Sequence, residues 1–302
     1  MFKRIPVTDL QIYSRCIALD LNNDTAIILR NLPKVKEKKE INIDPVKRSE
    51  VEVASLIKNA MVELELLNPS DLTYEVKVED FSKPKVADSF IGNFFPSIET
   101  ETDRVLATGP SGAGKTTFCA EMIIHYLSLF PDRKVFIISS LEEDVTLEPL
   151  QEYFEENIIR FNLPEMFLDE NSEIDPDTLA SSMVFFDDVD TLINPHLRTK
   201  VLTFRDFLLE QHRHFNIFLL MTTHLMSNFR ETRRLLNETR KIVVFPGSGA
   251  DYHILNFLTK FVGIGMRRAK EIVNKTDNHT RWVMISKTAP LYMITENKLN
   301  AI

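Results

Sequence analysis

Short apolar runs alternate with amphipathic stretches between residues 103 and 248 of this 302-residue chain. Runs that are apolar along their whole length, such as KVFIISS and NIFLLMTTH, are typical of strands buried on both faces of a parallel sheet. The stretches between them have helical spacing, which predicts an α/β fold with helices on both faces. The expected strands are 104–109, 134–140, 158–163, 183–190, 216–224 and 241–245, with helices ending near 130, near 146–156 and through 199–212.

The two flanking regions have a different pattern. CIALDL and TAIILRNL, separated by Asn22-Asn23-Asp24, predict a β-hairpin, followed by a helix over 50–66 and a strand in LTYEVKVED. After residue 248, two short helices around FVGIG precede a terminal hairpin formed by RWVMIS and LYMIT. We therefore expect a small α+β region over 1–88, an α/β core over 89–248, and a helical and hairpin extension over 249–302.

Composition narrows the class of protein. An apolar content of 44% is ordinary for a folded domain, and no apolar run reaches the roughly 18 residues that a membrane span needs. The first residues lack the pattern of a signal peptide, so we expect an intracellular protein with no membrane span. Cys16 and Cys119 lie far apart without metal-ligand spacing, which favours neither a disulfide framework nor a zinc site.

Charge is distributed unevenly along the chain. The formal net charge is −8, but residues 141–190 carry 16 acidic residues against Arg160 alone, a net of −15. Residues 191–302 carry 17 basic and 8 acidic residues, a net of +9. This asymmetry permits two interpretations, a solvated surface or a basic face that attracts nucleic acid.

The most specific motif is TGPSGAGKTTF, which satisfies the Walker A pattern GxxxxGK[ST] between an expected strand and an expected helix. In such a loop, backbone N–H groups and the helix N-terminus hold phosphates, a lysine reaches the β- and γ-phosphates, and a hydroxyl binds Mg²⁺. The motif predicts ATP and Mg²⁺ as ligands, with Lys115 and Thr116 in those two roles; the alternative is a glycine-rich turn before an amphipathic helix. The predicted nucleotide-binding residues are Gly109, Pro110, Ser111, Gly112, Ala113, Gly114, Lys115, Thr116 and Thr117.

Two acids end the apolar run MVFF, in the Walker B position. A buried parallel strand delivers such carboxylates to the sheet edge where the phosphate loop lies. We expect Asp187 to hold the metal and Asp188 to orient or deprotonate the attacking water. The alternative is a pair of helix-capping acids at a strand end, and Asp190 is interpreted as a cap or surface acid.

The run NIFLLMTTH also ends in polar residues, Thr222, Thr223 and His224. Lys115 and Asp187 are 72 residues apart, which leaves room for two crossover units. If the 216–224 strand lies between the loop strand and the acid-bearing strand, its polar tip would contact the γ-phosphate and the water. A strand that simply reaches solvent explains the same residues.

Together these motifs resemble the genome-packaging ATPases of large DNA viruses, including the poxvirus type, within the FtsK/HerA division of P-loop ATPases. The resemblance covers roughly residues 100–250 and rests on GPSGAGKTT, FFDDVD, HRHFNIFLLMTTH and FRETRRLLNETRKIVVF in that order. It implies a P-loop NTPase fold of the RecA/ASCE type, hydrolysis of ATP in a ring of identical subunits, and sequence-independent pumping of double-stranded DNA. A capsid or portal-vertex protein would then be a partner, in an infected host cell or associated with the virion.

The same resemblance implies an arginine that completes the neighbouring subunit's site. Arg213 matches the basic segment and is the first choice, with Arg233 and Arg234 as substitutes; the alternative for each is a solvated arginine at a helix end. His224 stands where relatives commonly carry glutamine, so a neutral histidine would act there in one tautomer. Thr223 is the other candidate for the sensor.

A second segment, FVGIGMRRAKEIV over 261–273, resembles a helix-hairpin-helix element. In such an element the GIG turn presents backbone N–H groups to a DNA phosphate, and Arg267, Arg268 and Lys270 would add attraction independent of sequence. The alternative is a glycine that ends one helix and joins it to the next.

Three functions fit these observations. The first is an ATP-hydrolysing DNA translocase that packages a viral double-stranded DNA genome into capsids. The second is a P-loop kinase or phosphotransferase that acts on a small substrate. The third is a nucleotide-gated scaffold protein with little turnover. The charge asymmetry and the acid pair beside a polar-tipped strand favour the first.

Overall fold

The computed structural model describes twelve separate stretches of the chain. They are residues 2–6, 16–20, 25–29, 94–141, 144–161, 163, 174–224, 232–246, 251–274, 281–288, 291–296 and 299–301. The predicted helix over 50–66 and the predicted strand in 72–80 lie outside these residues.

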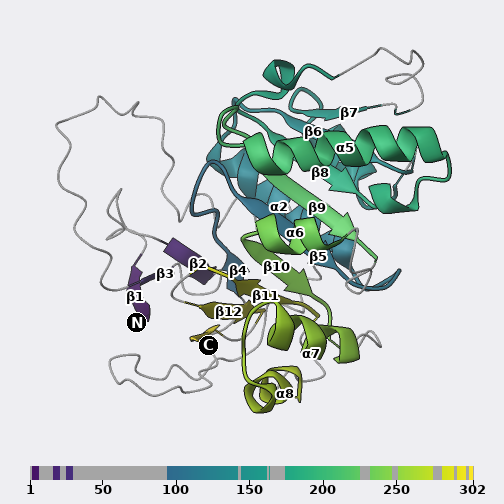
Figure 1. The fold of residues 1–302 in the computed structure, drawn as a ribbon. Coiled ribbons are helices and arrows are strands. Elements are labelled where there is room, and N and C mark those ends of the chain that lie inside the picture. The colour runs from purple at the N-terminus through teal and green to yellow at the C-terminus, as the bar shows by residue number, and fades with distance from the viewer. Residues whose placement is uncertain are drawn as a thin grey trace.

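A nine-stranded sheet forms the centre of the molecule, in the order β13-β12-β11-β10-β5-β9-β8-β6-β7 (Figure 1). Its parallel strands are β5 (Arg104–Thr108), β6 (Val135–Ser139), β7 (Ile158–Arg160), β8 (Met183–Asp187), β9 (Phe218–Thr223) and β10 (Lys241–Val244). Every one of these strands was expected from its apolar run. The parallel sheet predicted from the sequence is therefore confirmed.

Helices cover both faces of this sheet. One face carries α2 (Lys115–Leu129) and α3 (Glu148–Tyr153), and the other carries α5 (Pro195–Gln211), α6 (Thr232–Glu238), α7 (Asp251–Lys260) and α8 (Met266–Asn274). Two short 3₁₀ turns, η3 (Pro176–Leu179) and η4 (Val189–Thr191), precede and follow β8. Two apolar clusters, one on each face, bury the strands' side chains. Within the described stretches, no helix is long and apolar enough to cross a membrane.

The C-terminal strands extend the sheet. Strands β11 (Val283–Ser286) and β12 (Tyr292–Thr295) form the predicted hairpin, and β13 (Leu299–Ala301) pairs with β12. β11 pairs antiparallel with β10, so the hairpin continues the central sheet and makes it mixed. Trp282 packs edge-on against Phe118 of α2, with ring centroids 5.2 Å apart.

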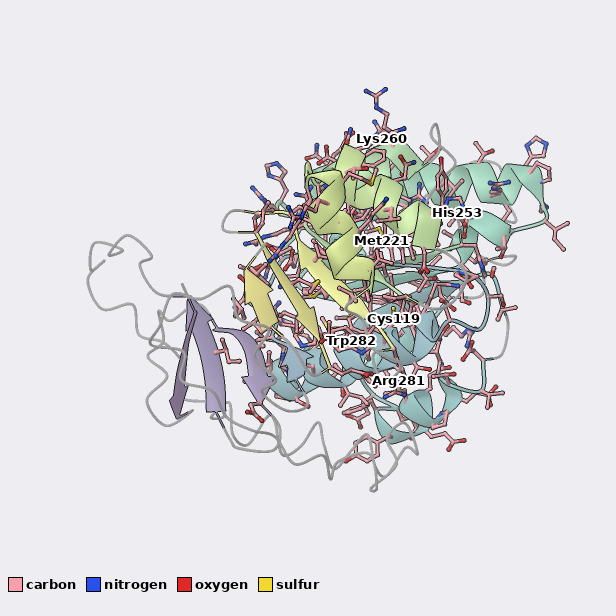
Figure 2. The ribbon with its side chains drawn as sticks, turned by 90° about the horizontal axis from the view of Figure 1, so that it is seen from below. Cys119, Met221, His253, Lys260, Arg281 and Trp282 are labelled. Atoms are coloured by element: carbon pink, nitrogen blue, oxygen red, sulfur yellow. The ribbon has the colours of Figure 1, made fainter. Side chains whose placement is uncertain are left out.

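The N-terminal strands form a separate four-stranded antiparallel sheet, in the order β1-β3-β2-β4. Its strands are β1 (Phe2–Pro6), β2 (Cys16–Asp20), β3 (Thr25–Leu29) and β4 (Phe94–Pro96). The pairing of β2 with β3 confirms the predicted hairpin. Figure 2 shows this sheet beside the C-terminal strands, and β4 contacts β12. Residues of β2 and β3 share an apolar cluster with α2.

Candidate active site

The phosphate loop, the acid-bearing strand and the polar-tipped strand end at one edge of the sheet. β9 lies between β5 and β8 and is parallel to both. This order meets the condition under which the polar tip of β9 would lie beside the phosphate loop and the acid pair. Because carboxyl ends of parallel strands meet at the same edge, the polar groups that follow β5, β8 and β9 are brought together.

The loop over 109–114 has the backbone that a phosphate cradle needs. Gly112 and Gly114 adopt left-handed φ values of 74° and 94°, which glycine tolerates without strain. A Cβ at Gly109 would lie 3.3 Å from the ring of Phe245, which packs against the loop at the end of β10. The first N–H groups of α2, from Lys115 to Thr117, have no carbonyl partner within the helix and are available to an anion.

Lys115 extends into this loop. Its Nζ donates to the carbonyl oxygens of Gly109 and Pro110, both at 3.2 Å, and lies 3.9 Å from Asp188 Oδ1. The lysine is buried, whereas Ser111 at the loop tip is exposed and Thr116 and Thr117 are half-buried. The structure therefore places a cation at the centre of the loop, next to the second acid of β8.

Asp187 is buried at the end of β8. Its Oδ1 lies 2.9 Å from Thr222 Oγ1, and its Oδ2 accepts a bond of 3.3 Å from Ser139 Oγ. Burial, followed by the neighbouring charge of Asp188, raises the pKa of Asp187 to about 6, and the two hydroxyls oppose this shift. A carboxylate with an unmatched negative charge favours a cation.

The oxygen atoms at this edge of the sheet are of the kind that Mg²⁺ binds. Across the described residues, no group of three or more His, Cys, Asp or Glu side chains forms a metal site by itself. Mg²⁺ prefers oxygen ligands and is commonly held by one or two carboxylates together with substrate phosphates and water. Asp187 and Thr116 are the residues that would hold it here.

Asp188 has an unusual backbone and a partly open side chain. Its φ is 46°, in the left-handed region, and its N–H donates to Thr222 Oγ1 at 2.7 Å. Its side chain is 20% exposed and makes no capping bond to η4, so the helix-cap interpretation is wrong for this acid. Instead, Asp188 Oδ2 lies 2.8 Å from His224 Nε2.

The contacts of His224 define one tautomer. Its Nδ1 lies 3.5 Å from Lys115 Nζ, and its Nε2 lies 2.8 Å from the carboxylate of Asp188. An ammonium group has only donors and a carboxylate only acceptors, so Nδ1 accepts and Nε2 carries the proton. The sequence alone did not indicate which ring nitrogen carries the proton.

At this edge, Thr222 was missed from the sequence and Asp190 was misread. Thr222 Oγ1 accepts from the N–H of Asp188 and lies within 3.0 Å of both carboxylates, so Thr222 is the link between β8 and β9. Thr223 Oγ1 donates to Asp190 Oδ2 at 2.9 Å, away from the acid pair. The interpretation of Asp190 as a cap or surface acid is wrong. The signal for Thr222 was its place in the polar tip, beside the two residues that were chosen.

Comparison with curated proteins gives a relative of viral origin. No protein-family model matches the chain. The uncharacterized protein V3 of the Sputnik virophage is 35% identical over 195 residues, which cover 64% of this chain and 74% of V3. The chain belongs to the family of V3.

Solved structures with a similar arrangement include viral and archaeal proteins. The genome packaging NTPase B204 of Sulfolobus turreted icosahedral virus 2, in complex with ATPγS, aligns with a TM-score of 0.43 at 12% identity, over 65% of this chain and 97% of that chain. A KaiC-like protein of Pyrococcus horikoshii aligns with a TM-score of 0.34 at 22% identity, over 50% and 72%. Because both scores are below 0.5, the P-loop NTPase fold is assigned from this chain's own strand order and phosphate loop.

None of the three candidate arginines is brought to Asp188 by the contacts of its own chain. Arg213 is exposed in the turn before β9, at the amino edge of the sheet, opposite the phosphate loop. Arg234 pairs with Asp206 and Glu210 of α5, at 3.2 and 2.8 Å. Arg233 is exposed at the start of α6. To reach an Asp188 carboxylate, any of these three arginines would therefore have to act on another copy.

The FVGIG segment joins α7 to α8, as expected. Gly263 has a left-handed φ of 80°, and Ile264 is buried with its N–H bonded to Leu258 O. Arg267 and Lys270 are exposed on α8. Both interpretations of this segment fit these facts, a phosphate-binding turn and a glycine that joins two packed helices.

Proposed function

We propose that the protein is an ATP-hydrolysing DNA translocase that packages a viral double-stranded DNA genome into capsids. The observation that carries the proposal is the contact between Asp188 and His224 at the open edge of the phosphate loop, 3.9 Å from Lys115. A loop that only binds nucleotide does not need a partly exposed acid with an oriented histidine beside it. Such a pair suits activation of a water molecule.

Each residue of the site has a part in this reaction. The loop's N–H groups bind the phosphates, and Lys115 exchanges its two carbonyl contacts for β- and γ-phosphate oxygens. Mg²⁺ at Thr116 and Asp187 would supply neutralising charge at the phosphates. Asp188 accepts a proton from the attacking water, and His224 orients that carboxylate through Nε2–H. Thr222 fixes the spacing of the two acids.

A second copy of the chain completes the site in this proposal. Large apolar side chains are exposed in the segments that follow strands β6 and β8 at the carboxyl edge: Leu141 after β6 (52%), Val145 before α3 (87%) and Ile193 after η4 (97%). The loops that carry Leu141 and Ile193 are joined by a bond of 3.2 Å from Thr191 Oγ1 to Ser140 Oγ. A contiguous exposed apolar patch can mark an interaction surface, and we infer that these side chains belong to one. The neighbour in a ring would cover this rim and supply an arginine, with Arg213 the first choice.

The acidic and basic parts of the chain support a polarised motor. Residues 141–190 carry a net charge of −15 and residues 191–302 a net of +9. We infer that duplex DNA contacts the basic part without reading sequence, with Arg267, Arg268 and Lys270 as candidate contacts. A capsid or portal-vertex protein would be the remaining partner, in an infected host cell, in line with the viral source of V3.

Phosphate release from ATP tests the proposal, measured with and without duplex DNA of two unrelated sequences at low and moderate salt. We expect both duplexes to raise the rate equally and the stimulation to fall as salt rises. A rate that ignores duplex at both salt concentrations contradicts translocation. Turnover that requires a small phosphate acceptor would identify a phosphotransferase, and tight binding without phosphate release would identify a scaffold protein.

A mixing experiment tests completion of the site between copies. Asp188→Asn retains the arginine and loses the acid, whereas Arg213→Ala retains the acid and loses the arginine. In a ring, some sites in the mixture receive both native residues, so we expect the mixture to hydrolyse ATP faster than either variant alone. Activity equal to the average of the two variants contradicts the assignment of Arg213.

A further inference from the structure

The turn that follows β8 wraps around the end of β9. Adjacent residues of a strand direct their side chains to opposite faces. Yet Thr222 contacts Asp187 and Asp188, while Thr223 contacts Asp190, which is only two residues further along. The turn over 187–190 therefore contacts both sides of the strand end. The left-handed φ of 46° at Asp188 makes this change of direction possible.

Asp190 holds the strand end by two hydrogen bonds to one oxygen. Its Oδ2 accepts from Thr223 Oγ1 at 2.9 Å and from the backbone N–H of His224 at 3.3 Å. Its Oδ1 is buried and has no hydrogen-bond partner among the residues that the structure describes. Burying a carboxylate oxygen without a partner costs free energy, so stability alone gives a weak reason for an acid here.

His224 is consequently held at both ends by acids of the same short turn. Its main chain is fixed by Asp190, and its ring contacts Asp188 through Nε2. The bond from the His224 N–H to Asp190 fixes the position of the backbone from which the ring extends. The contact of the ring with Asp188 fixes the orientation of that carboxylate. A shift of the strand tip would therefore move His224 relative to the acid.

We propose that Asp190 is the positioning residue that aims His224 at Asp188. The inference rests on the proposed ATPase function, because it concerns the pair that activates water there. Asp190 itself does not contact the phosphate loop in any described hydrogen bond, so its effect passes through His224 and Thr223. A displacement of about 1 Å in such a group costs roughly 100-fold in rate.

The test compares Asp190→Ala, Asp190→Asn and Thr223→Val with Asp132→Ala, a matched removal of an exposed aspartate between α2 and β6. Asparagine retains an oxygen that can accept both bonds, whereas alanine retains none. We expect Asp190→Ala to lower kcat roughly 10- to 100-fold with the KM for ATP nearly unchanged, and Asp190→Asn to restore kcat to within about threefold of the native value. Thr223→Val, which retains the bond to His224 N–H, should lower kcat less than Asp190→Ala.

A second readout does not depend on turnover. The ring-nitrogen NMR signals of His224, assigned with His224→Gln, report its contact with Asp188. We expect these signals to move toward those of an exposed histidine in Asp190→Ala and to keep their position in Asp190→Asn and Asp132→Ala. If the native protein releases no phosphate, the function fails while this readout still tests the positioning.

Two results would overturn the role of Asp190. One is a folded Asp190→Ala protein with native kcat and unmoved His224 signals. The other is an equal loss of kcat in Asp190→Asn and Asp190→Ala, which would assign the effect to the negative charge rather than to the two hydrogen bonds.

Discussion

Charged side chains cluster at the amino edge of the central sheet, where its parallel strands begin, and at the carboxyl edge, where they end. The two clusters differ in whether positive and negative charges balance. At the amino edge, Lys241 at the start of β10 lies 3.1 Å from both Glu99 Oε1 and Asp103 Oδ2. The side chains of these three residues are 2% exposed or less, and the Tyr292 hydroxyl donates to Glu99. This cluster joins the segment before β5 to β10 and β12.

Charge is matched within the amino-edge cluster. Burial opposes the charge of Lys241, but the carboxylates of Asp103 and Glu99 outweigh it and hold the pKa of the lysine above its usual value. Arg240 lies 3.9 Å from Glu99 Oε2 and adds positive charge. At the carboxyl edge, by contrast, burial and Asp188 raise the pKa of Asp187 to about 6. Negative charge there is in excess.

The difference in charge balance suggests that the amino-edge cluster contributes to stability and the carboxyl-edge acids to the proposed reaction. Ion pairs that are closed and matched hold elements together, and removing one partner leaves a buried charge uncompensated. In the proposed reaction, the acids in excess at the carboxyl edge, of which Asp188 is partly exposed, would face a cation and a phosphate. The comparison therefore predicts that substitutions at the amino edge change stability and that substitutions at the carboxyl edge change turnover.

The largest expected effect is that of Lys241→Met on stability. This change leaves Glu99 and Asp103 buried without their cation, so we expect the free energy of unfolding to fall by about 3–5 kcal/mol. Denaturant titration measures it. The matched control is Lys260→Met at the exposed end of α7, expected to change stability by less than about 0.5 kcal/mol. Equal effects at the two lysines would remove the basis of the comparison.

The next effect is that of Thr222→Val on turnover. Removing this hydroxyl leaves the N–H of Asp188 and one oxygen of Asp187 without their partner, so we expect hydrolysis to fall roughly 100-fold, with Thr222→Ser restoring most of it. The control is Thr108→Val on neighbouring β5, whose buried hydroxyl has no described hydrogen-bond partner. Thr108→Val should leave hydrolysis and stability close to native. A Thr222→Val enzyme with native turnover would contradict the link between β8 and β9.

The smallest effect is that of Tyr292→Phe. The phenol donates to the buried carboxylate of Glu99, while the ring packs in the apolar core. Loss of a bond to a charged group, with the ring retained, should cost ~1.5 kcal/mol of stability. Thermal and denaturant unfolding measure it, and phosphate release per folded molecule should stay unchanged. A fall in turnover without a fall in stability would show that the amino edge takes part in the reaction.

Much of the fold could be predicted because its strands are buried on both faces. Such strands are apolar along their whole length, and their order along the chain was visible between residues 103 and 248. The meeting of the phosphate loop, Asp187 and the tip of β9 followed from the geometry of parallel strands. The C-terminal hairpin was also visible in the sequence. Its attachment to β10 was not, because the outermost strand on either side of a sheet can pair with an antiparallel strand.

The detailed roles at the carboxyl edge could not be predicted. Thr222 and Thr223 are adjacent hydroxyls on opposite faces of β9, and only the path of the turn after β8 decides which one contacts the acid pair. That path depends on the left-handed backbone of Asp188, which the letters DDVD do not reveal. Lys241 was equally hidden, because its partners Glu99 and Asp103 are more than 130 residues away in the sequence.

The central claim is that Asp188 acts in hydrolysis and not in nucleotide binding. One measurement addresses it directly: ATP affinity and single-turnover phosphate release on the same preparation of Asp188→Asn, beside the native protein. We predict an affinity within a few-fold of native and phosphate release slower by at least about 100-fold, the contribution of a general base. Native phosphate release by Asp188→Asn would contradict the account.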